Sequence, residues 1–267
     1  MRTIQLTIAY DGAAYAGWQM QAEQPTIQAA IESAVHKITG TPTRVIASGR
    51  TDSGVHALGQ VASFDTESRL TAGQLQRALN AELPHDIAVL RAVDARPGFH
   101  AIRDCIGKRY RYVLHDGPTR DVFHRHHSWH VRQRLDVGAM RQAAGALVGS
   151  HDFRSFETQW PNRESSVRTV REIAIERRTD HPSLIDFEIE ADGFLYNMVR
   201  AIVGTLVEVG RSARSIDWPT AVLAAQDRSQ AGATAPAQGL FLLRVDYPPD
   251  VLLLVSDHAA AEATRGE

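Results

Sequence analysis

An arginine and an aspartate stand two residues apart in a glycine-rich segment of the first half of the chain. The segment is Gly49-Arg50-Thr51-Asp52-Ser53-Gly54-Val55-His56-Ala57, and we expect it to form a loop between two short strands. In extended geometry the side chains of Arg50 and Asp52 project from the same face. A guanidinium beside a carboxylate lowers the pKa of the carboxylate and keeps it ionised, which suits a nucleophile and does not suit a general acid. Asp52 is therefore a candidate nucleophile with Arg50 as its partner, and the alternative is a structural ion pair that braces a turn.

Apolar periodicity predicts the elements that would hold this loop. A strand is predicted over residues 2–10, and short strands over 44–47 and 60–64 flank the loop itself. A helix is predicted to begin after Thr26, which is a good N-cap, and to end before Gly40. A second helix over 72–83 stops at Pro84, and a strand over 87–93 follows. Residues 1–104 are therefore predicted to be an α+β half that carries the loop.

A similar succession of elements is predicted in the second half, residues 105–247. A strand over 107–114 places Tyr110 and Tyr112 on one face and Arg109 and Arg111 on the other. The other predicted elements are helices over 136–148, 194–209 and 220–226 and strands over 167–176, 184–189 and 240–245. Strands interrupted by helices, without regular βαβ alternation, indicate the α+β class. Residues 248–267 are expected to be a partly disordered tail.

Composition narrows the class of protein. The chain has 267 residues, of which 43% are hydrophobic, so it can bury a sizeable core. It contains a single cysteine, which excludes an internal disulfide and indicates a reducing compartment. The first residues alternate between apolar and polar types and do not form a signal peptide, and no apolar run is long enough to span a bilayer. A cytoplasmic protein without membrane association is expected.

Positive charge gathers in one stretch of an otherwise acidic chain. The net charge is −2, yet residues 96–134 hold nine Lys and Arg against three Asp. A locally basic stretch is typical of contact with a phosphate backbone, and the alternative is a solvated face whose charges pair with acids elsewhere. The same stretch holds the histidines His124, His126, His127 and His130. Because no cysteine, and no carboxylate except Asp121, stands at a supporting spacing, we expect no metal site.

Several motifs, in order along the chain, resemble those of the tRNA pseudouridine synthase A family. The segment from Gly49 to Ala57 resembles the catalytic loop of that family. Further matching segments are Tyr10-Asp11-Gly12 with Tyr15 and Gly17-Trp18-Gln19, Asn80-Ala81 with Leu83-Pro84 and Asp86-Ile87, Phe99-His100-Ala101 with Arg103, Lys108-Arg109-Tyr110-Arg111-Tyr112, Phe194 with Asn197-Met198-Val199-Arg200 and Ile202-Val203-Gly204, and Gln238-Gly239-Leu240. The resemblance covers residues 2–247. It implies a mixed, mainly antiparallel sheet flanked by helices, with two similar halves around a central cleft.

The resemblance also assigns roles to individual residues. It implies that Asp52 is the nucleophile, that Arg50 is its arginine partner, and that Arg200 is a helix-borne arginine that pairs with the aspartate. It implies that Tyr110 packs against the target base. Without the resemblance, Tyr110 would be interpreted as a core tyrosine and Arg200 as a solvated arginine. Arg109 and Arg111, on the opposite face of the same strand, are predicted to bind the RNA substrate.

The implied reaction is the isomerisation of uridine to pseudouridine. The resemblance implies uridines 38, 39 and 40 in the tRNA anticodon stem-loop as targets and a homodimer as the working form. No cofactor is expected, and the sequence has neither a G-x-G-x-x-G fingerprint nor a P-loop. The target base must leave the stack, and a tyrosine beside the carboxylate can hold it flipped. Asp52 would attack either C1′ of the ribose or C6 of the base, and the sequence leaves both routes open.

Two other functions compete with this one. Asp52-Ser53-Gly54 has the D-[ST]-G pattern of aspartic proteases, and a homodimer could supply two copies. That chemistry needs two carboxylates that share one proton, which Arg50 would disturb. The second competitor is a non-catalytic RNA-binding protein with an aromatic-bearing sheet, in which Asp52 would be dispensable.

Overall fold

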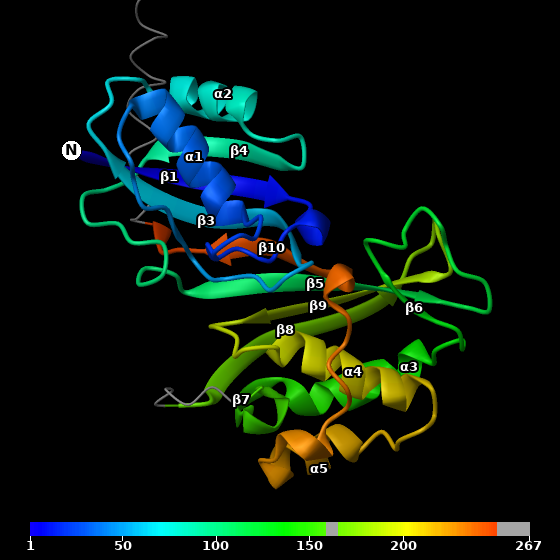
Figure 1. Cartoon of the computed structure of the whole chain (residues 1–267). Helices are drawn as coiled ribbons and strands as arrows, with labels where there is room; N and C mark the ends of the chain where they lie inside the picture. Colours follow the sequence, from blue (N-terminus) through cyan, green and yellow to red (C-terminus); the bar gives the residue numbers. More distant parts are fainter. Residues whose placement is uncertain (159–164, 250–267) are drawn as a thin grey trace, which may run out of the picture. The chain divides into compact units, whose positions relative to one another are not determined.

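Two compact units make up the chain (Figure 1). The computed structural model describes residues 1–158 and 165–249. The first unit comprises Met1–Ile106 and the described residues from Leu242, and the second comprises Gly107–Phe241. The expectation of a partly disordered tail concerns residues 248–267, of which 250–267 lie outside the described residues. No helix within the described part of the chain has the length and apolar character that crossing a membrane requires.

The strands of the first unit follow the order β4-β1-β3-β10, and β1 pairs antiparallel with both β3 and β4. Its strands are β1 (Arg2–Tyr10), β2 (Ile46–Ala47), β3 (His56–Thr66), β4 (Ile87–Asp94) and β10 (Leu240–Asp246), and β2 pairs with β3. The central strand β1 pairs with β3 and β4, and its residues Ile4, Leu6 and Ile8 are fully buried. Strand β3 begins at His56, earlier than the predicted residue 60, because Ala57 pairs with Tyr10 of β1.

Both predicted helices of the first unit are confirmed. Helix α1 (Ile27–Thr39) begins where the Thr26 side chain accepts a hydrogen bond from the Ala29 N–H, and ends at Gly40, whose φ is 73°. Helix α2 (Ala72–Glu82) begins with a capping box formed by Thr71 and Gln74. It packs along β4 and against α1 (Figure 1). Local capping chemistry therefore fixes both ends of α1 and the start of α2.

The strands of the second unit pair mainly antiparallel with one another. Its strands are β5 (Gly107–Asp116), β6 (Trp129–Val131), β7 (Gly149–Asp152), β8 (Val167–Arg177) and β9 (Leu184–Ala191), in the order β5-β9-β8-β7. Strand β6, which the sequence did not reveal, pairs in parallel with the end of β5. The predicted alternation along β5 is confirmed, since Tyr110 and Tyr112 are buried while Arg109 and Arg111 are half-buried. Together with the helices, these mainly antiparallel strands confirm the α+β class.

Three helices, α3 (Val137–Ala144), α4 (Met198–Gly210) and α5 (Trp218–Ala225), pack on one another in the second unit (Figure 1). The predicted apolar stripe of α4 is buried, and burial extends around most of the helix. The helix begins at Met198 rather than Phe194, because Asn197 adopts a left-handed conformation with φ 62°. The remaining helical segments are 3₁₀ turns at Gly12–Ala14, Gly145–Leu147, Arg154–Phe156, Arg228–Gln230 and Ala237–Gly239.

A buried carboxylate joins three segments of the second unit. Asp116, at the end of β5, is fully buried and accepts hydrogen bonds from Arg177 Nη1 at 2.7 Å and Nη2 at 2.8 Å. Arg134 donates at 3.0 Å and the Leu135 N–H at 2.8 Å. Burial raises the pKa of the Asp116 carboxyl, but the hydrogen bonds from Arg177 and Leu135 and the charges of both arginines outweigh it, so that the pKa is lowered. Ionised Asp116 thus ties β5 to β8 and to the segment before α3.

Replacing Asp116 by Asn should lower the free energy of unfolding by about 3 kcal/mol near neutral pH, because partly buried Arg177 loses its counter-charge. A lowered carboxyl pKa stabilises the fold above the unfolded value of about 4, and this contribution is lost as the pH falls through the lower folded value. The difference between wild type and Asp116→Asn should therefore shrink below about pH 4. Urea unfolding of both proteins over a pH series measures this difference. A difference that does not depend on pH would contradict the ionised state of buried Asp116.

Candidate active site

The loop that bears Asp52 connects β2 to β3 in the first unit and ends in a tight turn. The Val55 N–H donates to the Asp52 carbonyl oxygen at 3.1 Å, which closes a four-residue turn that begins at Asp52. Gly54, the third residue of this turn, has φ 77°, a value that side chains with a Cβ rarely adopt. Asp52 itself is partly exposed. The turn therefore presents a carboxylate to solvent from a backbone of defined geometry.

Four polar side chains beneath the loop form a buried hydrogen-bond network, which we call the loop network: Tyr10, Ser48, Thr51 and Gln60. The Tyr10 and Thr51 hydroxyls share a hydrogen bond of 2.8 Å. Gln60 Nε2 donates to the Gly49 carbonyl oxygen at 2.9 Å and to the Tyr10 hydroxyl at 3.4 Å, while Ser48 donates to Gln60 Oε1 at 2.8 Å. Thr51 is 7% and Gln60 0% exposed. Burial raises the pKa of Tyr10 to about 12, so its hydroxyl keeps its proton at neutral pH.

The aromatic-rich segment after β1, residues 15–18, is hydrogen-bonded to the loop. The Trp18 N–H donates to the Thr51 carbonyl oxygen at 3.0 Å, and Ser53 Oγ donates to the Tyr15 carbonyl oxygen at 3.2 Å. A Cβ on Gly17, which has φ +99°, would lie only 2.6 Å from the Thr51 carbonyl oxygen. The aromatic-rich segment and the Asp52 loop are therefore one interlocked structure, which explains why both carry distinctive sequence motifs.

His56, the first residue of β3, is a structural part of this arrangement. Its ring is 1% exposed, and Nδ1 accepts a hydrogen bond of 3.1 Å from the Gly12 N–H. The same Nδ1 also lies 3.0 Å from Asp11 Oδ1. His56 thereby fixes the turn after β1 to the start of β3.

Arg50 and Asp52, which both lie in the described part of the chain, do not form the expected ion pair. Arg50 is exposed and has no carboxylate partner in that part of the chain. The expectation assumed an extended backbone, but the chain turns at Asp52, so the two side chains need not share a face. Arg50 remains a candidate catalytic residue by resemblance only.

Tyr110, the predicted base-contacting residue, lies on β5 in the second unit. Its side chain is 9% exposed and packs edge-to-face against Phe194, with ring centroids 5.0 Å apart. It pairs across the sheet with Ile189 of β9. The aromatic contact gives the tyrosine ring one fixed orientation.

Arg200 lies in the first turn of α4 and is held by hydrogen bonds. Its Nε donates to the Ala235 carbonyl oxygen at 2.7 Å, and Nη1 donates to Asn197 Oδ1 at 3.0 Å. The side chain is half-buried. The interpretation of Arg200 as a freely solvated arginine is therefore wrong, and its guanidinium has a defined position in the second unit.

Arg109 and Arg111 meet carboxylates across the sheet. Arg109 lies 2.8 Å from Glu188 and 3.2 Å from Glu172, and Arg111 donates to Glu188 Oε1 from Nε at 2.9 Å and from Nη2 at 2.7 Å. Burial raises the pKa of Glu188, but the hydrogen bond from Arg111 and the charges of both arginines outweigh it and the pKa is lowered. An RNA phosphate would therefore compete with Glu188 for these two cations.

One cluster in the second unit has the residue types of a metal site. Asp121, His124 and His181 place one ligand atom each within 4.8 Å of one another. The Asp121 Oδ2 atom lies 2.7 Å from His124 Nδ1 and 3.3 Å from His181 Nε2. The hydrogen bond with His124 is the chief cause that lowers the pKa of Asp121 to about 2. Hydrogen bonding accounts for this geometry, and the absence of a metal site stays a prediction.

Known proteins resemble the chain along most of its length. A family model described as tRNA pseudouridine synthase matches residues 6–102 and 143–248. The tRNA pseudouridine synthase A of Moorella thermoacetica is 47% identical over 249 residues, which are 92% of this chain and 100% of that protein. Proteins of the same name are 46% identical in Halalkalibacterium halodurans, over 90% of each chain, and 43% identical in Geobacter sulfurreducens, over 92% of this chain and 100% of the relative.

These similarities decide between the functions that the sequence left open. The matched residues include the Asp52 loop, the segment that clamps it, and the β5 and α4 elements of the second unit. A protease or a non-catalytic RNA-binding module is not supported by any of them. At this identity over nine tenths of its length, the chain belongs to the tRNA pseudouridine synthase family, and it is an enzyme that isomerises uridine to pseudouridine in tRNA.

Proposed function

We propose that the enzyme modifies uridines 38, 39 and 40 of the tRNA anticodon stem-loop, with Asp52 as its nucleophile and no cofactor. One observation supports the role of Asp52 as nucleophile. Its side chain is partly exposed at the start of a tight turn, on a loop that buried hydrogen bonds hold in place. Reactions of this kind gain most from a fixed approach of the reacting groups, because misplacement by about 1 Å costs on the order of 100-fold in rate. The likeness to enzymes named tRNA pseudouridine synthase A supports the target sites.

The chemistry needs one carboxylate and no redox partner. The bond between N1 of uracil and C1′ breaks, the uracil turns, and C5 bonds to C1′. The proton that leaves C5 and the proton that N1 gains balance, so the product is an isomer of the substrate. The Asp52 carboxylate would act by attack on C1′ or on C6, and it is released when the new bond is complete.

Two residues of the second unit would assist this reaction. Tyr110, whose ring Phe194 fixes, would stack on the flipped uracil and exclude water from it. Arg200, held by Ala235 and Asn197, would supply the positive charge that keeps the catalytic aspartate ionised. The fixed orientation of each side chain supports these roles, because a preorganised group need not be ordered during the reaction.

The working form and location follow from the same resemblance. We infer a homodimer that binds one tRNA across both subunits, acting in the cytoplasm, where tRNA is used. Sedimentation of the enzyme alone and with tRNA measures the mass of each species, and a monomer under both conditions would contradict the homodimer.

Incubation with bulk tRNA that lacks pseudouridine tests the proposed sites. We expect pseudouridine at positions 38, 39 and 40 of several tRNAs, and at no other position. In the same assay Asp52→Asn should abolish turnover, because it keeps the shape of the side chain but removes the nucleophilic charge. Folding and tRNA affinity should remain those of the wild type.

A matched control is available in the same unit. Asp65, an exposed aspartate on β3, loses the same charge in Asp65→Asn and should keep full activity. Pseudouridine formed above a trace by Asp52→Asn would disprove the nucleophile. Activity at other tRNA positions with Asp52 still essential would disprove the target sites alone.

The proposed RNA contact of Arg111 has a separate test. If its guanidinium neutralises one phosphate, Arg111→Gln should weaken tRNA binding. The plot of the logarithm of the association constant against the logarithm of the salt concentration should also become shallower, by about 0.7–0.9 in slope. Binding titrations over a salt series give both quantities. An unchanged affinity and slope would mean that Arg111 serves only its intramolecular pair with Glu188.

A further inference from the structure

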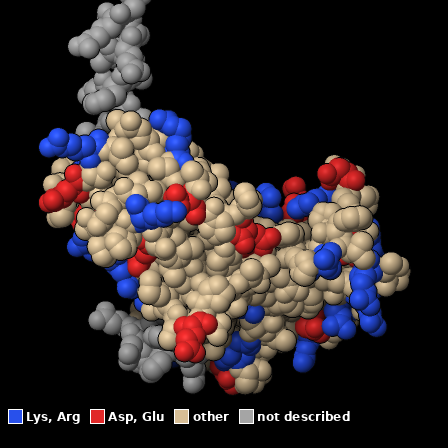
Figure 2. Space-filling model, turned by 45° about the horizontal axis from the view of Figure 1, so that its top comes forward, with Lys and Arg blue, Asp and Glu red and all other residues tan. Residues whose placement is uncertain are grey.

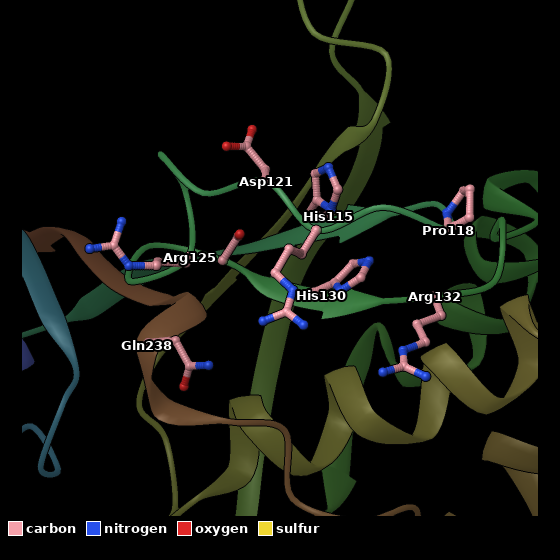
Figure 3. Close-up of a pocket in the computed structure, with 9 residues that line it drawn as sticks. His115, Pro118, Asp121, Arg125, His130, Arg132 and Gln238 are labelled. Atoms are coloured by element: carbon pink, nitrogen blue, oxygen red, sulfur yellow. The ribbon is translucent and has the colours of Figure 1, made fainter.

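A cavity of about 480 Å³ opens inside the second unit, beside the end of β5 and the loop that leads to β6. The charged and imidazole side chains that line it are His115, Arg120, Asp121, Arg125, His130 and Arg132. Arg125 and Arg132 flank the cavity from opposite sides with His130 between them (Figure 3). Pockets of a few hundred Å³ with convergent polar groups are the usual size for a small ligand or a ligand fragment.

Several arginines of the basic stretch, residues 96–134, are already paired with carboxylates in the described part of the chain, and those of the cavity are not. Arg109, Arg111 and Arg134 each pair with a carboxylate. Arg120, Arg125 and Arg132 are exposed and have no carboxylate partner within the part of the chain that the structure describes. Lys and Arg side chains also gather on the surface over the loops around β6, at the right of Figure 2. Three uncompensated guanidiniums around one cavity favour an anion.

The single carboxylate of the cavity is already occupied. Asp121 Oδ1 accepts from the N–H groups of Phe123 at 2.8 Å and His124 at 3.1 Å. Its other oxygen faces the rings of His124 and His181. These contacts hold the carboxylate in place, and its single negative charge leaves the three arginines in excess.

The buried wall of the cavity holds an unsatisfied group. His115 is 5% exposed, and its Nδ1 has no hydrogen-bond partner among the described residues. The neighbouring ring of His130, whose centroid lies 5.1 Å away, is fixed by a hydrogen bond of 2.8 Å from Nε2 to the Gly117 carbonyl oxygen. A buried polar atom without a partner is uncommon in native structures and indicates a missing ligand or water.

We propose that this cavity binds a phosphate group, with Arg120, Arg125 and Arg132 on its oxygens and His115 Nδ1 as a further donor. Guanidiniums suit this ligand because they offer paired donors with the geometry of phosphate oxygens. The phosphate comes either from the backbone of the tRNA or from a free phosphate ion or ester. The site does not depend on the role of Asp52 or on which uridines are modified.

The test removes two of the three cations. Arg120→Gln/Arg132→Gln is compared with the control Arg154→Gln/Arg211→Gln, which removes the same charge from exposed arginines of the same unit outside the cavity. Since all four side chains are on the surface, both double variants should unfold at temperatures close to that of the wild type. The first measurement is tRNA affinity over a salt series with each protein.

If the ligand is an RNA phosphate, the cavity variant should lose about tenfold in affinity and its salt slope should become shallower by about 0.7–0.9, while the control stays near wild type. Pseudouridine formation at saturating tRNA should be unaffected in both, which separates this site from the proposed function. An equal loss in the control variant would overturn the site, because it would show only an effect of net charge.

The second measurement uses inorganic phosphate, with thermal unfolding at constant ionic strength. If the ligand is free phosphate, the ion should raise the unfolding temperature of the wild type and the control but not of the cavity variant, with tRNA affinity unchanged throughout. Wild-type behaviour of the cavity variant in both measurements would overturn the proposal.

Discussion

Buried hydrogen bonds beneath the Asp52 loop determine whether the carboxylate has a defined position. The loop is rich in glycine and polar residues and has little apolar surface to bury, so hydrophobic packing alone cannot fix its shape. The loop network supplies the missing constraint through Tyr10, Thr51 and Gln60. Hydrogen bonds of this kind are strong in a water-poor interior, and leaving one partner unsatisfied there costs about 1–3 kcal/mol. The loop therefore has one favoured conformation, in which Asp52 begins the turn at the surface.

The same network explains features of the first unit that lie outside the loop. Gln60 reaches the loop because it is paired with Ile8 in the β1–β3 ladder. The register of this ladder shifts between Ile8 and Tyr10, and such irregularities commonly re-aim a side chain near an active site. Tyr10 lies directly after the shift and also contacts Trp18 at 6.2 Å between ring centroids. The pairing of two central strands thus sets the position of the catalytic loop.

Patterns of apolar residues predicted the regular parts of the fold. The bounds of β1, α1, α2 and β5 follow from periodicity and capping residues, because burial of one face and satisfaction of helix ends are local requirements. The start of α4 was missed, since an apolar pattern does not reveal the left-handed conformation of Asn197. Strand β6 was missed because three residues that pair with the end of β5 leave no periodic signal.

The candidate site was predictable only in part, for a related reason. Asp52 was found because it stands in a distinctive motif, whereas the ion pair with Arg50 was inferred from an extended backbone that the turn at Asp52 interrupts. Nothing in the sequence pattern identified the loop network, because its members come from β1, β3 and the loop, and buried polar groups have no period. Gln60, a polar and fully buried residue of β3, belongs to this network.

The role of the loop network is tested most directly by the single-turnover rate of pseudouridine formation in Tyr10→Phe, Thr51→Val and the double variant. Tyr10→Phe keeps the ring and its contact with Trp18 but leaves the buried Thr51 hydroxyl without its partner. We expect each single variant to lose about tenfold or more in rate, with tRNA affinity within about twofold of wild type, because the loop loses its fixed geometry while the binding surface is intact. The two effects should also be strongly non-additive in the double variant, since both remove the same hydrogen bond. Wild-type single-turnover rates in Tyr10→Phe and Thr51→Val would contradict the claim that this network positions Asp52.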